Sequence, residues 1–419
     1  MNKVLVIGGG LLGLCSARAL HAKGFEVELI EAREGVALES SYGNGGLLTA
    51  SMSDPWNAPG VHKHLAASLF DPSSAMKLHL AAIPGLISWG LRFLANSNRK
   101  RYLKTVKANY QLASYSVRQT LAWREELKLE YGARDSGALK VFRDVTAMAG
   151  PLELAEMLEP LGLEFRQLDA DATVELEPAL QGIRDQISGA LYFPGDACGD
   201  SYRFCKALAA SLEESGVTLR TGASVDRLKL KGDRVSGVVV GGKLMPAESV
   251  VVATGADTAR LLRGSGLSLP VAPAKGYSVS FDIAGVADAP KIPVIDDAMH
   301  AGISPLGDKL RAVGTAEFTG YSRSLSQVRL DNLVQLLRDL YPQVAEQIDI
   351  QGAEPWTGLR PMSADGRPFI GPSRVRGLYF NTGHGHLGWT KAVGSACLLA
   401  DLVLGATPEL DPQPFQVHR

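Results

Sequence analysis

The chain has 419 residues and a formal net charge of −1, with 43 lysines and arginines against 44 aspartates and glutamates. That balance gives no support to nucleic-acid binding by bulk electrostatics. Its four widely spaced cysteines form no C-x-x-C pair, so neither a zinc site nor a disulfide framework is indicated. The length predicts two domains.

The N-terminal stretch has the pattern of a strand, a glycine turn and a helix. Residues 3–7 (KVLVI) are a short apolar run, and apolar residues then recur at helical spacing up to Gly24. Between them Gly8, Gly10 and Gly13 fit G-x-G-x-x-G. In such a turn the first glycine permits the bend, the second lets the backbone approach a pyrophosphate, and the third lets helix and strand pack closely.

A second strand is predicted over residues 25–30, and it ends in Glu31. An acid that follows the glycines by about 20 residues is typical of a ribose-binding carboxylate. The whole pattern predicts a dinucleotide site, and a glycine turn without a ligand is the alternative. Glu31 disfavours a cofactor with a 2′-phosphate, because the two negative charges would repel.

Two further segments carry distinct signals. Residues 40–46 (SSYGNGG) predict a loop with amides free to face a ligand, although a plain surface loop has the same composition. Apolar residues recur at helical spacing over 81–93, and a basic cluster follows at 98–107. That pairing suits an anionic membrane surface; a core-facing helix with a solvated basic end is the simpler interpretation.

The rest of the chain alternates between two patterns. Some predicted segments do not continue the strand–helix alternation of the N-terminal nucleotide-binding pattern. They are helices over 107–131, 148–158 and 328–340, and strands over 137–142, 187–193, 274–281, 302–305 and 311–317. The first pattern returns in a helix over 202–215, strands over 217–220 and 249–253, a hairpin over 225–240 and a final strand, glycine loop and helix over 378–404.

Four motifs allow the chain to be compared with a known family. They are residues 6–10 (VIGGG), 41–46 (SYGNGG), 358–366 (GLRPMSADG) and 381–390 (NTGHGHLGWT). On these motifs the chain resembles, through essentially its whole length, the D-amino acid oxidase-like family of FAD enzymes. The likeness is strongest to the bacterial D-amino acid dehydrogenases of the small-subunit type.

The resemblance implies an α/β fold with a Rossmann-like FAD-binding domain built from discontinuous segments, residues 1–50, 195–260 and 355–419. An α+β substrate-binding domain with a mostly antiparallel sheet takes residues 51–194 and 261–354. FAD would be bound by Gly8, Gly10, Leu11, Leu12, Gly13, Glu31, Ala32, Arg33, Ser40, Ser41, Asn44, Gly45, Gly46, Leu47, Val225, Ala253, Thr254, Gly255, Gly383, His384, Gly385, His386, Leu387, Gly388, Trp389 and Thr390.

Two residues are expected in the catalytic part of the site. The carboxylate-binding arginine of the family's G-L-R-P motif falls on Arg360, whose planar fork suits a carboxylate; alone, it would be interpreted as a surface ion pair. Tyr277 matches a family tyrosine that borders the substrate, and a core position is its alternative. The chain departs from the family in Asn44-Gly45-Gly46, where N-A-G is frequent, and in His386, where Thr is frequent.

The reaction implied is oxidative deamination of a D-amino acid, by hydride transfer from Cα to flavin N5, giving an imino acid or 2-oxo acid. D-Proline and D-hydroxyproline-like substrates are candidates, and residues 51–56, Tyr277, His300 and His386 are candidate pocket residues. A glycine- or sarcosine-type oxidase that uses O2 and a non-catalytic flavin-binding module are the alternatives. We expect no metal, since His384 and His386 lack an evident third ligand.

The expected partners are a small-molecule D-amino acid and an electron acceptor, for which a membrane quinone is a candidate, with no nucleic acid. A homo-oligomer is compatible with the sequence. No uninterrupted apolar stretch reaches the ~18 residues of a spanning helix. The expected location is therefore cytoplasmic, with peripheral attachment to the inner face of the cell membrane as the further possibility raised by the basic cluster.

Overall fold

A parallel sheet near the N-terminus forms the first layer of the molecule. In the computed structural model, residues 3–68 and 76–419 are described. Five strands of this sheet run parallel, and one edge strand is antiparallel. Their spatial order is β19 (Phe369–Pro372), β20 (Leu378–Thr382), β13 (Ser249–Val252), β1 (Lys3–Ile7), β2 (Glu26–Ile30) and β9 (Thr218–Arg220). The sheet is therefore Rossmann-like, as the resemblance implies, and is assembled from distant parts of the chain.

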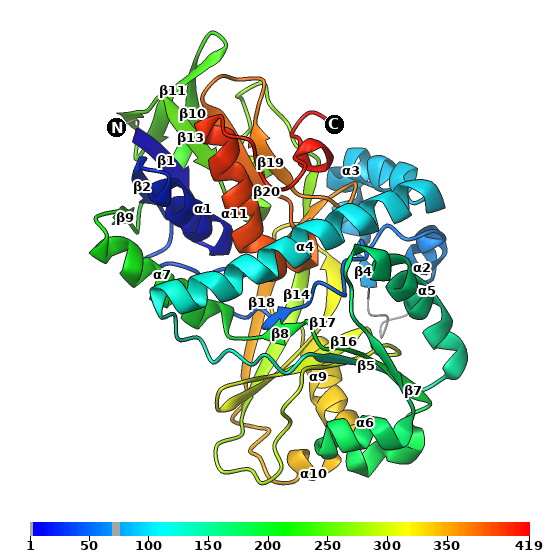
Figure 1. Cartoon of the computed structure of the whole chain (residues 1–419). Helices are drawn as coiled ribbons and strands as arrows, with labels where there is room; N and C mark the ends of the chain where they lie inside the picture. The colour runs from blue at the N-terminus through cyan, green and yellow to red at the C-terminus, as the bar shows by residue number, and fades with distance from the viewer. Residues whose placement is uncertain (1–2, 69–75) are drawn as a thin grey trace.

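Two helices cover one face of this sheet, and a third packs on them and joins them to the rest of the molecule. Helices α1 (Leu11–Ala22) and α11 (Gly388–Leu404) pack against each other, and α4 (Arg99–Leu127) crosses α11 (Figure 1). Their contact buries apolar side chains such as Leu14 and Leu399 completely. Because burial of apolar surface is the main stabilising term, this helical layer fixes the start of α1 relative to the start of α11.

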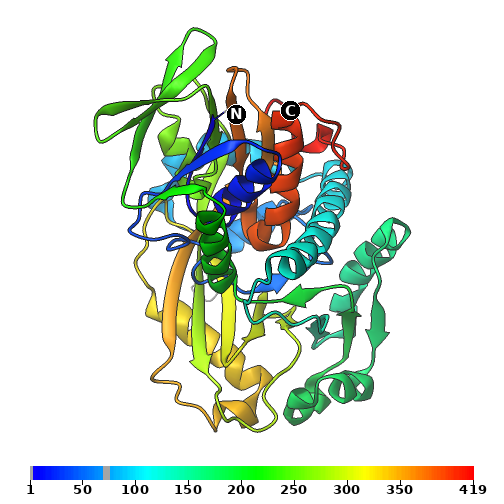
Figure 2. The ribbon, with the colours of Figure 1, turned by 60° about the vertical axis from the view of Figure 1, so that its left-hand side comes forward.

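A larger sheet of nine strands forms the second part of the molecule. Its pairings are antiparallel except for β15 with β5 and β17 with β4, so the predicted mostly antiparallel sheet is confirmed. The long strands extend away from the α1–α11 layer (Figure 2). The spatial order of the strands in this sheet is β18 (Glu354–Ser363), β14 (Val271–Asp282), β17 (Lys309–Phe318), β16 (Ala301–Leu306), β15 (Val294–Asp296), β5 (Ala138–Phe142), β7 (Gly189–Phe193) and β6 (Arg166–Leu168), with β4 (Met76–Leu78) beside β17.

Smaller elements complete the fold. Helix α9 (Gln327–Leu340) packs on β14 and β17 through leucines that are fully buried. The remaining elements are α2 (Val61–Ser68), α3 (Ile83–Asn96), α5 (Ala149–Leu158), α6 (Ala170–Leu176), α7 (Ser201–Glu214), α8 (Thr258–Leu261), α10 (Pro342–Ala345), the sheet β10 (Val225–Lys231), β11 (Arg234–Val240) and β12 (Lys243–Pro246), and the pair β3 (Leu47–Leu48) and β8 (Ala197–Cys198).

Most predicted elements lie within a few residues of the observed ones, with two differences. Helix α4 begins at Arg99, eight residues before the predicted start, because Asn98 caps it by accepting a hydrogen bond from the Arg101 amide at 3.1 Å. Strand β18 pairs along β14 in the nine-stranded sheet, whereas the predicted boundary placed residues from 355 onwards in the FAD-binding domain. The division into two functional domains, with its boundary at residue 355, stays a prediction.

One helical stretch of the described chain, Gly385–Leu404, is long and apolar enough to cross a membrane. It is mostly buried in the molecule, where α11 packs between α1 and α4. A core helix passes the same test of length and composition.

Candidate active site

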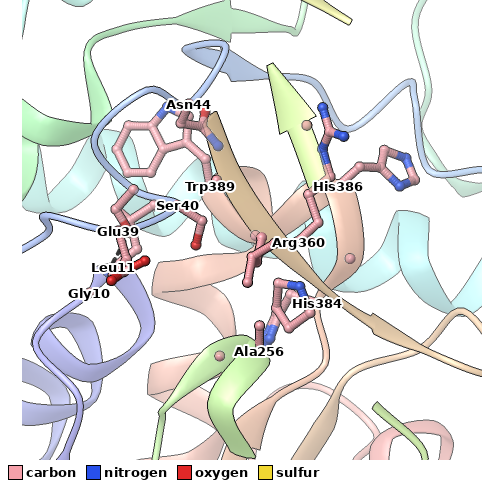
Figure 3. A pocket seen from close by; sticks show the side chains of 18 of the residues that line it. Gly10, Leu11, Glu39, Ser40, Asn44, Ala256, Arg360, His384, His386 and Trp389 are labelled. Atoms are coloured by element: carbon pink, nitrogen blue, oxygen red, sulfur yellow. Dashed lines mark hydrogen bonds between the residues drawn. The ribbon is translucent and has the colours of Figure 1, made fainter. Parts of the chain in front are cut away.

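A large cavity receives residues from both sheets. Its volume is about 1190 Å³, which exceeds the 300–1,000 Å³ of ordinary small-molecule sites. The cavity is lined by the turn before α1, the end of β2, the loop before β3, the end of β13, parts of β14, β17 and β18, and the start of α11 (Figure 3). A dinucleotide together with a small substrate needs a space of this kind.

The start of α1 forms one wall of the cavity. Gly10 is the N-cap and offers no side-chain acceptor, so the first amides of α1 are open to a ligand apart from that of Leu11, which donates to Ser41 Oγ at 3.2 Å. Gly8 has φ +107°, a conformation that favours glycine. A Cβ at Gly13 would lie 1.7 Å from the Gly8 carbonyl oxygen. The helix therefore sits close to β1 with its positive end on the cavity, as anion binding requires.

Glu31 lies in the cavity wall at the end of β2. Its two carboxylate oxygens accept hydrogen bonds from the Gly9 amide at 2.6 Å and the Arg33 amide at 2.7 Å. These bonds fix the carboxylate beside the glycine turn, where the predicted ribose site requires it.

The loop between β20 and α11 forms the opposite wall. His384 is buried and its Nε2 lies 2.8 Å from Ser395 Oγ, so its ring is held within the helix layer. Thr390 Oγ1 donates to the Leu47 carbonyl at 3.2 Å and ties the loop to β3. Since Gly388 to Thr390 line the cavity at the first turn of α11, the helix dipole favours negative charge there.

Arg360 projects from β18 into the cavity, where its side chain is half-buried. Its Nη1 donates to the Thr315 carbonyl at 2.7 Å, and among residues 3–68 and 76–419 no carboxylate pairs with it. Burial lowers the pKa of Arg360 to about 10, so the guanidinium is charged at neutral pH. A half-buried cation that faces a cavity, with no carboxylate partner among the described residues, can bind an anion.

The backbone around Arg360 has an unusual conformation. Thr315 has φ +56°, which is a genuine outlier for a β-branched residue. It lies where the β14–β17 pairing shifts register, between the pairs Lys275–Glu317 and Tyr277–Gly314. This bulge turns the Thr315 carbonyl towards the guanidinium.

Tyr277 lines the same part of the cavity but its hydroxyl group is engaged elsewhere. It donates to Glu317 at 2.8 Å, and Glu317 also accepts from Arg329 at 2.9 Å and lies 3.3 Å from Lys275 Nζ. Burial raises the pKa of Glu317, but the two hydrogen bonds and the positive charges outweigh burial and lower it to about 2. The tyrosine is therefore anchored by a buried carboxylate.

All of the predicted site residues line the cavity except Gly13, Gly46 and Gly383, which lie outside its lining. Their binding roles stay predictions. Of the predicted pocket segment, Met52 and residues 54–56 line the cavity, and so does His300. Sequence reasoning missed Thr315, Gly276 and Trp356. Gly276 precedes Tyr277 and Trp356 precedes the G-L-R-P motif, so their positions offered a signal, whereas Thr315 offered none.

A Rossmann-like sheet and a glycine turn that opens on a large cavity define a dinucleotide-binding protein. Arg360, which has no carboxylate partner among the described residues, faces the same cavity. Comparison with known proteins specifies the family. Residues 3–402 match the family described as FAD dependent oxidoreductase. The chain therefore belongs to the FAD-dependent oxidoreductase family, and FAD is its cofactor.

Similar proteins extend along the whole chain. A protein named D-amino acid dehydrogenase from Rhizobium johnstonii is 38% identical over 417 residues, which are 100% of this chain and 99% of that relative. The fold is similar to L-proline dehydrogenase from P. horikoshii, with a TM-score of 0.79 at 18% identity over 100% of this chain and 97% of that one. Glycine oxidase from Bacillus cereus gives 0.74 at 21% identity, over 100% and 99% of the two chains.

The residues present fit FAD. The uncapped start of α1 suits the pyrophosphate, and Glu31 suits a ribose. The turn that brings them together has no room for a side chain at Gly13. The start of α11 supplies positive potential at the other wall.

Proposed function

We propose that this protein is an FAD-dependent D-amino acid dehydrogenase, which oxidatively deaminates D-amino acids to imino acids and 2-oxo acids. The observation that carries the proposal is Arg360, a charged group in the cavity that lacks a carboxylate partner among the described residues. An α-carboxylate fits that requirement. Relatives named D-amino acid dehydrogenase at 38% and 39% identity over nearly the full length support the D-configuration.

In this proposal each sheet has a separate task. The six-stranded sheet and its loops hold FAD, which when bound accepts the hydride from the substrate Cα. The nine-stranded sheet holds the substrate: Arg360 binds its carboxylate in two hydrogen bonds and so fixes the direction of the Cα–H bond. Tyr277 and Trp56 exclude water from the same space. Positioning of this kind lowers a barrier by several kcal/mol.

The first experiment is an anaerobic absorbance titration of the purified holoprotein with D- and L-amino acids, including D-proline and the hydroxyproline isomers. We expect the flavin band to bleach with D-isomers only. Arg360→Ala should keep its flavin and lose bleaching at the same concentrations. Bleaching by glycine or sarcosine alone, with peroxide formed in air, would indicate the oxidase alternative. A flavin that no amine bleaches would indicate a flavin-binding module.

We also infer that the electron acceptor is a membrane quinone and that the protein lies peripherally on the inner face of the membrane. The observation that supports this is an exposed apolar face on and before α3, formed by Leu80, Ile87, Leu91 and Leu94, which are 71%, 57%, 66% and 44% exposed. Exposed Arg92 and the basic start of α4 lie next to it in the chain. An apolar stripe flanked by cations fits an anionic lipid surface.

Flotation of the protein with phosphatidylcholine vesicles, with and without phosphatidylglycerol, tests this inference. Binding should need the anionic lipid and weaken with salt. Leu91→Glu should abolish binding, whereas Leu244→Glu, at a position on β12 that is 54% exposed, should not. If Leu91→Glu instead dissolves an oligomer seen by light scattering, the face joins two copies of the chain.

A further inference from the structure

The indole ring of Trp56 brings two side chains of the cavity together. The imidazole of His386 stacks on it, with ring centroids 5.4 Å apart and planes inclined by 15°. The Arg360 guanidinium carbon lies 5.6 Å from the centre of the same indole ring. His386 and Arg360 come from different elements, the short 3-10 turn Gly385–Leu387 before α11 and strand β18, and their side chains lie near each other in Figure 3. The anion site and the imidazole therefore face one part of the cavity.

The imidazole of His386 has a ring nitrogen to offer a ligand. A neutral imidazole carries a proton on one ring nitrogen and presents a lone pair on the other. Burial, followed by the charges of Lys391 and Arg360, lowers the pKa of His386 to about 3. At neutral pH the ring is therefore an acceptor and cannot serve as a proton store.

An amino acid needs both kinds of partner. Its carboxylate needs donors, which Arg360 has, and its amine N–H needs an acceptor. The Tyr277 hydroxyl proton is already donated to Glu317. His386 is half-buried and in the cavity wall, so its free nitrogen is accessible to a ligand held by Arg360.

We propose that His386 is a substrate-binding residue, whose unprotonated ring nitrogen accepts a hydrogen bond from the amine N–H of the amino acid that Arg360 holds by its carboxylate. This inference rests on the proposed function. It gives Trp56 the task of positioning the imidazole by stacking. It also defines the substrate as an amine that carries at least one N–H, primary or secondary.

The test compares two ligands that differ in the amine. One is the D-amino acid that bleaches the flavin fastest, whose Kd comes from the concentration dependence of anaerobic flavin reduction. The other is propionate, which has a carboxylate and no amine, and whose Ki is measured in competition with that amino acid. His386→Phe keeps an aromatic ring on Trp56 and removes the acceptor. His386→Asn keeps an amide acceptor and removes the ring.

We expect His386→Phe to raise the Kd of the amino acid about 3–10-fold, which is the loss of one hydrogen bond, and to change the propionate Ki less than twofold. His386→Asn should recover part of the affinity. Arg360→Lys should weaken both ligands. The pH profile of flavin reduction should keep its apparent pKa in His386→Phe, since the imidazole does not titrate at working pH.

The proposal is overturned if His386→Phe weakens propionate as much as the amino acid, or leaves both unchanged. A purely structural role would produce the first result, with a lower melting temperature. These outcomes are separate from failure of the proposed function, in which no D-amino acid reduces the flavin of the unmodified enzyme.

Discussion

The guanidinium group of Arg360 lies flat against the backbone of Gly276 on the neighbouring strand β14. A methyl group at Gly276 would come within 2.3 Å of the guanidinium carbon, well inside the ~3.5 Å of ordinary contact. Gly276→Ala should therefore push the side chain away from the carbonyl that orients it. Misplacement by about 1 Å costs up to about 100-fold in catalysis, so we expect the KM for the D-amino acid to rise about 10–100-fold.

Steady-state kinetics and the flavin absorbance of the same preparation check this prediction. The flavin content should stay that of the unmodified protein, because Gly276 lies on the substrate side. Gly150→Ala is the matched control, since nothing lies within 4 Å of a Cβ there. A Gly276→Ala enzyme with an unchanged KM would mean that the arginine does not bind the substrate in the orientation seen.

Thr315 holds the same arginine from a strained conformation. Its φ of +56° costs about 1–3 kcal/mol for a non-glycine residue, and glycine adopts it freely. Thr315→Gly keeps the carbonyl that accepts from Arg360. We expect the free energy of unfolding to be equal to or higher than that of the unmodified protein, and KM to stay within about threefold.

Urea unfolding measures the stability, and Thr218→Gly provides the comparison. Thr218 is exposed on strand β9 and its φ is not positive, so glycine there should destabilise by about 0.5–1 kcal/mol. Equal losses in the two variants would show that Thr315 carries no strain.

Arg360 and Thr315 also show how much of the site can be predicted from the sequence. The glycine turn, Glu31 and Arg360 were predicted because short motifs fix them: G-x-G-x-x-G is a local backbone requirement, and G-L-R-P marks the arginine. Their positions in one cavity follow from the order of parallel strands. The predicted strands and helices were found within a few residues for the same reason, since periodicity is a local signal.

The conformation of Thr315 could not be predicted. It results from a register shift between β14 and β17, two strands that are distant in the sequence, and threonine has a high strand propensity whatever its φ. The sheet to which β18 belongs could not be predicted either. Strand β18 leads into the C-terminal part of the nucleotide-binding fold, and only its pairing with β14 assigns it to the larger sheet.

Tyr277 is predicted to matter more for stability than for chemistry. Its hydroxyl donates to the buried Glu317 at 2.8 Å, and a hydrogen bond to a charged group contributes about 1.5–3 kcal/mol. Tyr277→Phe should lose that amount of unfolding free energy, measured at pH 7, while kcat/KM for the D-amino acid changes less than about fivefold. Tyr192→Phe removes a bond to the neutral Ser136 carbonyl at 3.1 Å and should cost about 1 kcal/mol.

Tyr277→Phe should also change how the free energy of unfolding depends on pH in the acid range. The folded-state pKa of Glu317 is about 2, below its ordinary value, so its stabilising contribution is present above about pH 4.5 and is lost as the pH falls towards 2. Tyr277→Phe should raise the folded-state pKa of Glu317, so the loss should be smaller and should be complete at a higher pH. If kcat/KM instead falls by about two orders of magnitude without a change in stability, the hydroxyl group takes part in the reaction.

Asp196 gives the opposite pH dependence. Its carboxylate is buried against the start of the loop that carries Trp56, and it accepts hydrogen bonds from the Ser51 hydroxyl and from the Ser51 amide at 3.3 Å. Burial raises its pKa to about 7. Because the folded state holds this proton more tightly than the unfolded chain does, the resulting stability is complete below about pH 4 and is lost as the pH rises through 7. Asp196→Asn cannot ionise. Between pH 5 and pH 7.5 the free energy of unfolding of the unmodified protein should therefore fall by about 2–3 kcal/mol relative to that of the variant.

Urea unfolding at the two pH values measures that gain directly. Asp54→Asn, on an exposed side chain of the same loop, should follow the unmodified protein at both pH values. If Asp196→Asn also runs parallel to the unmodified protein, the carboxylate is ionised throughout this range. In that case the hydrogen bonds from Ser51 outweigh the cost of burial, and the loop that places Trp56 beside Arg360 is held by a charged group.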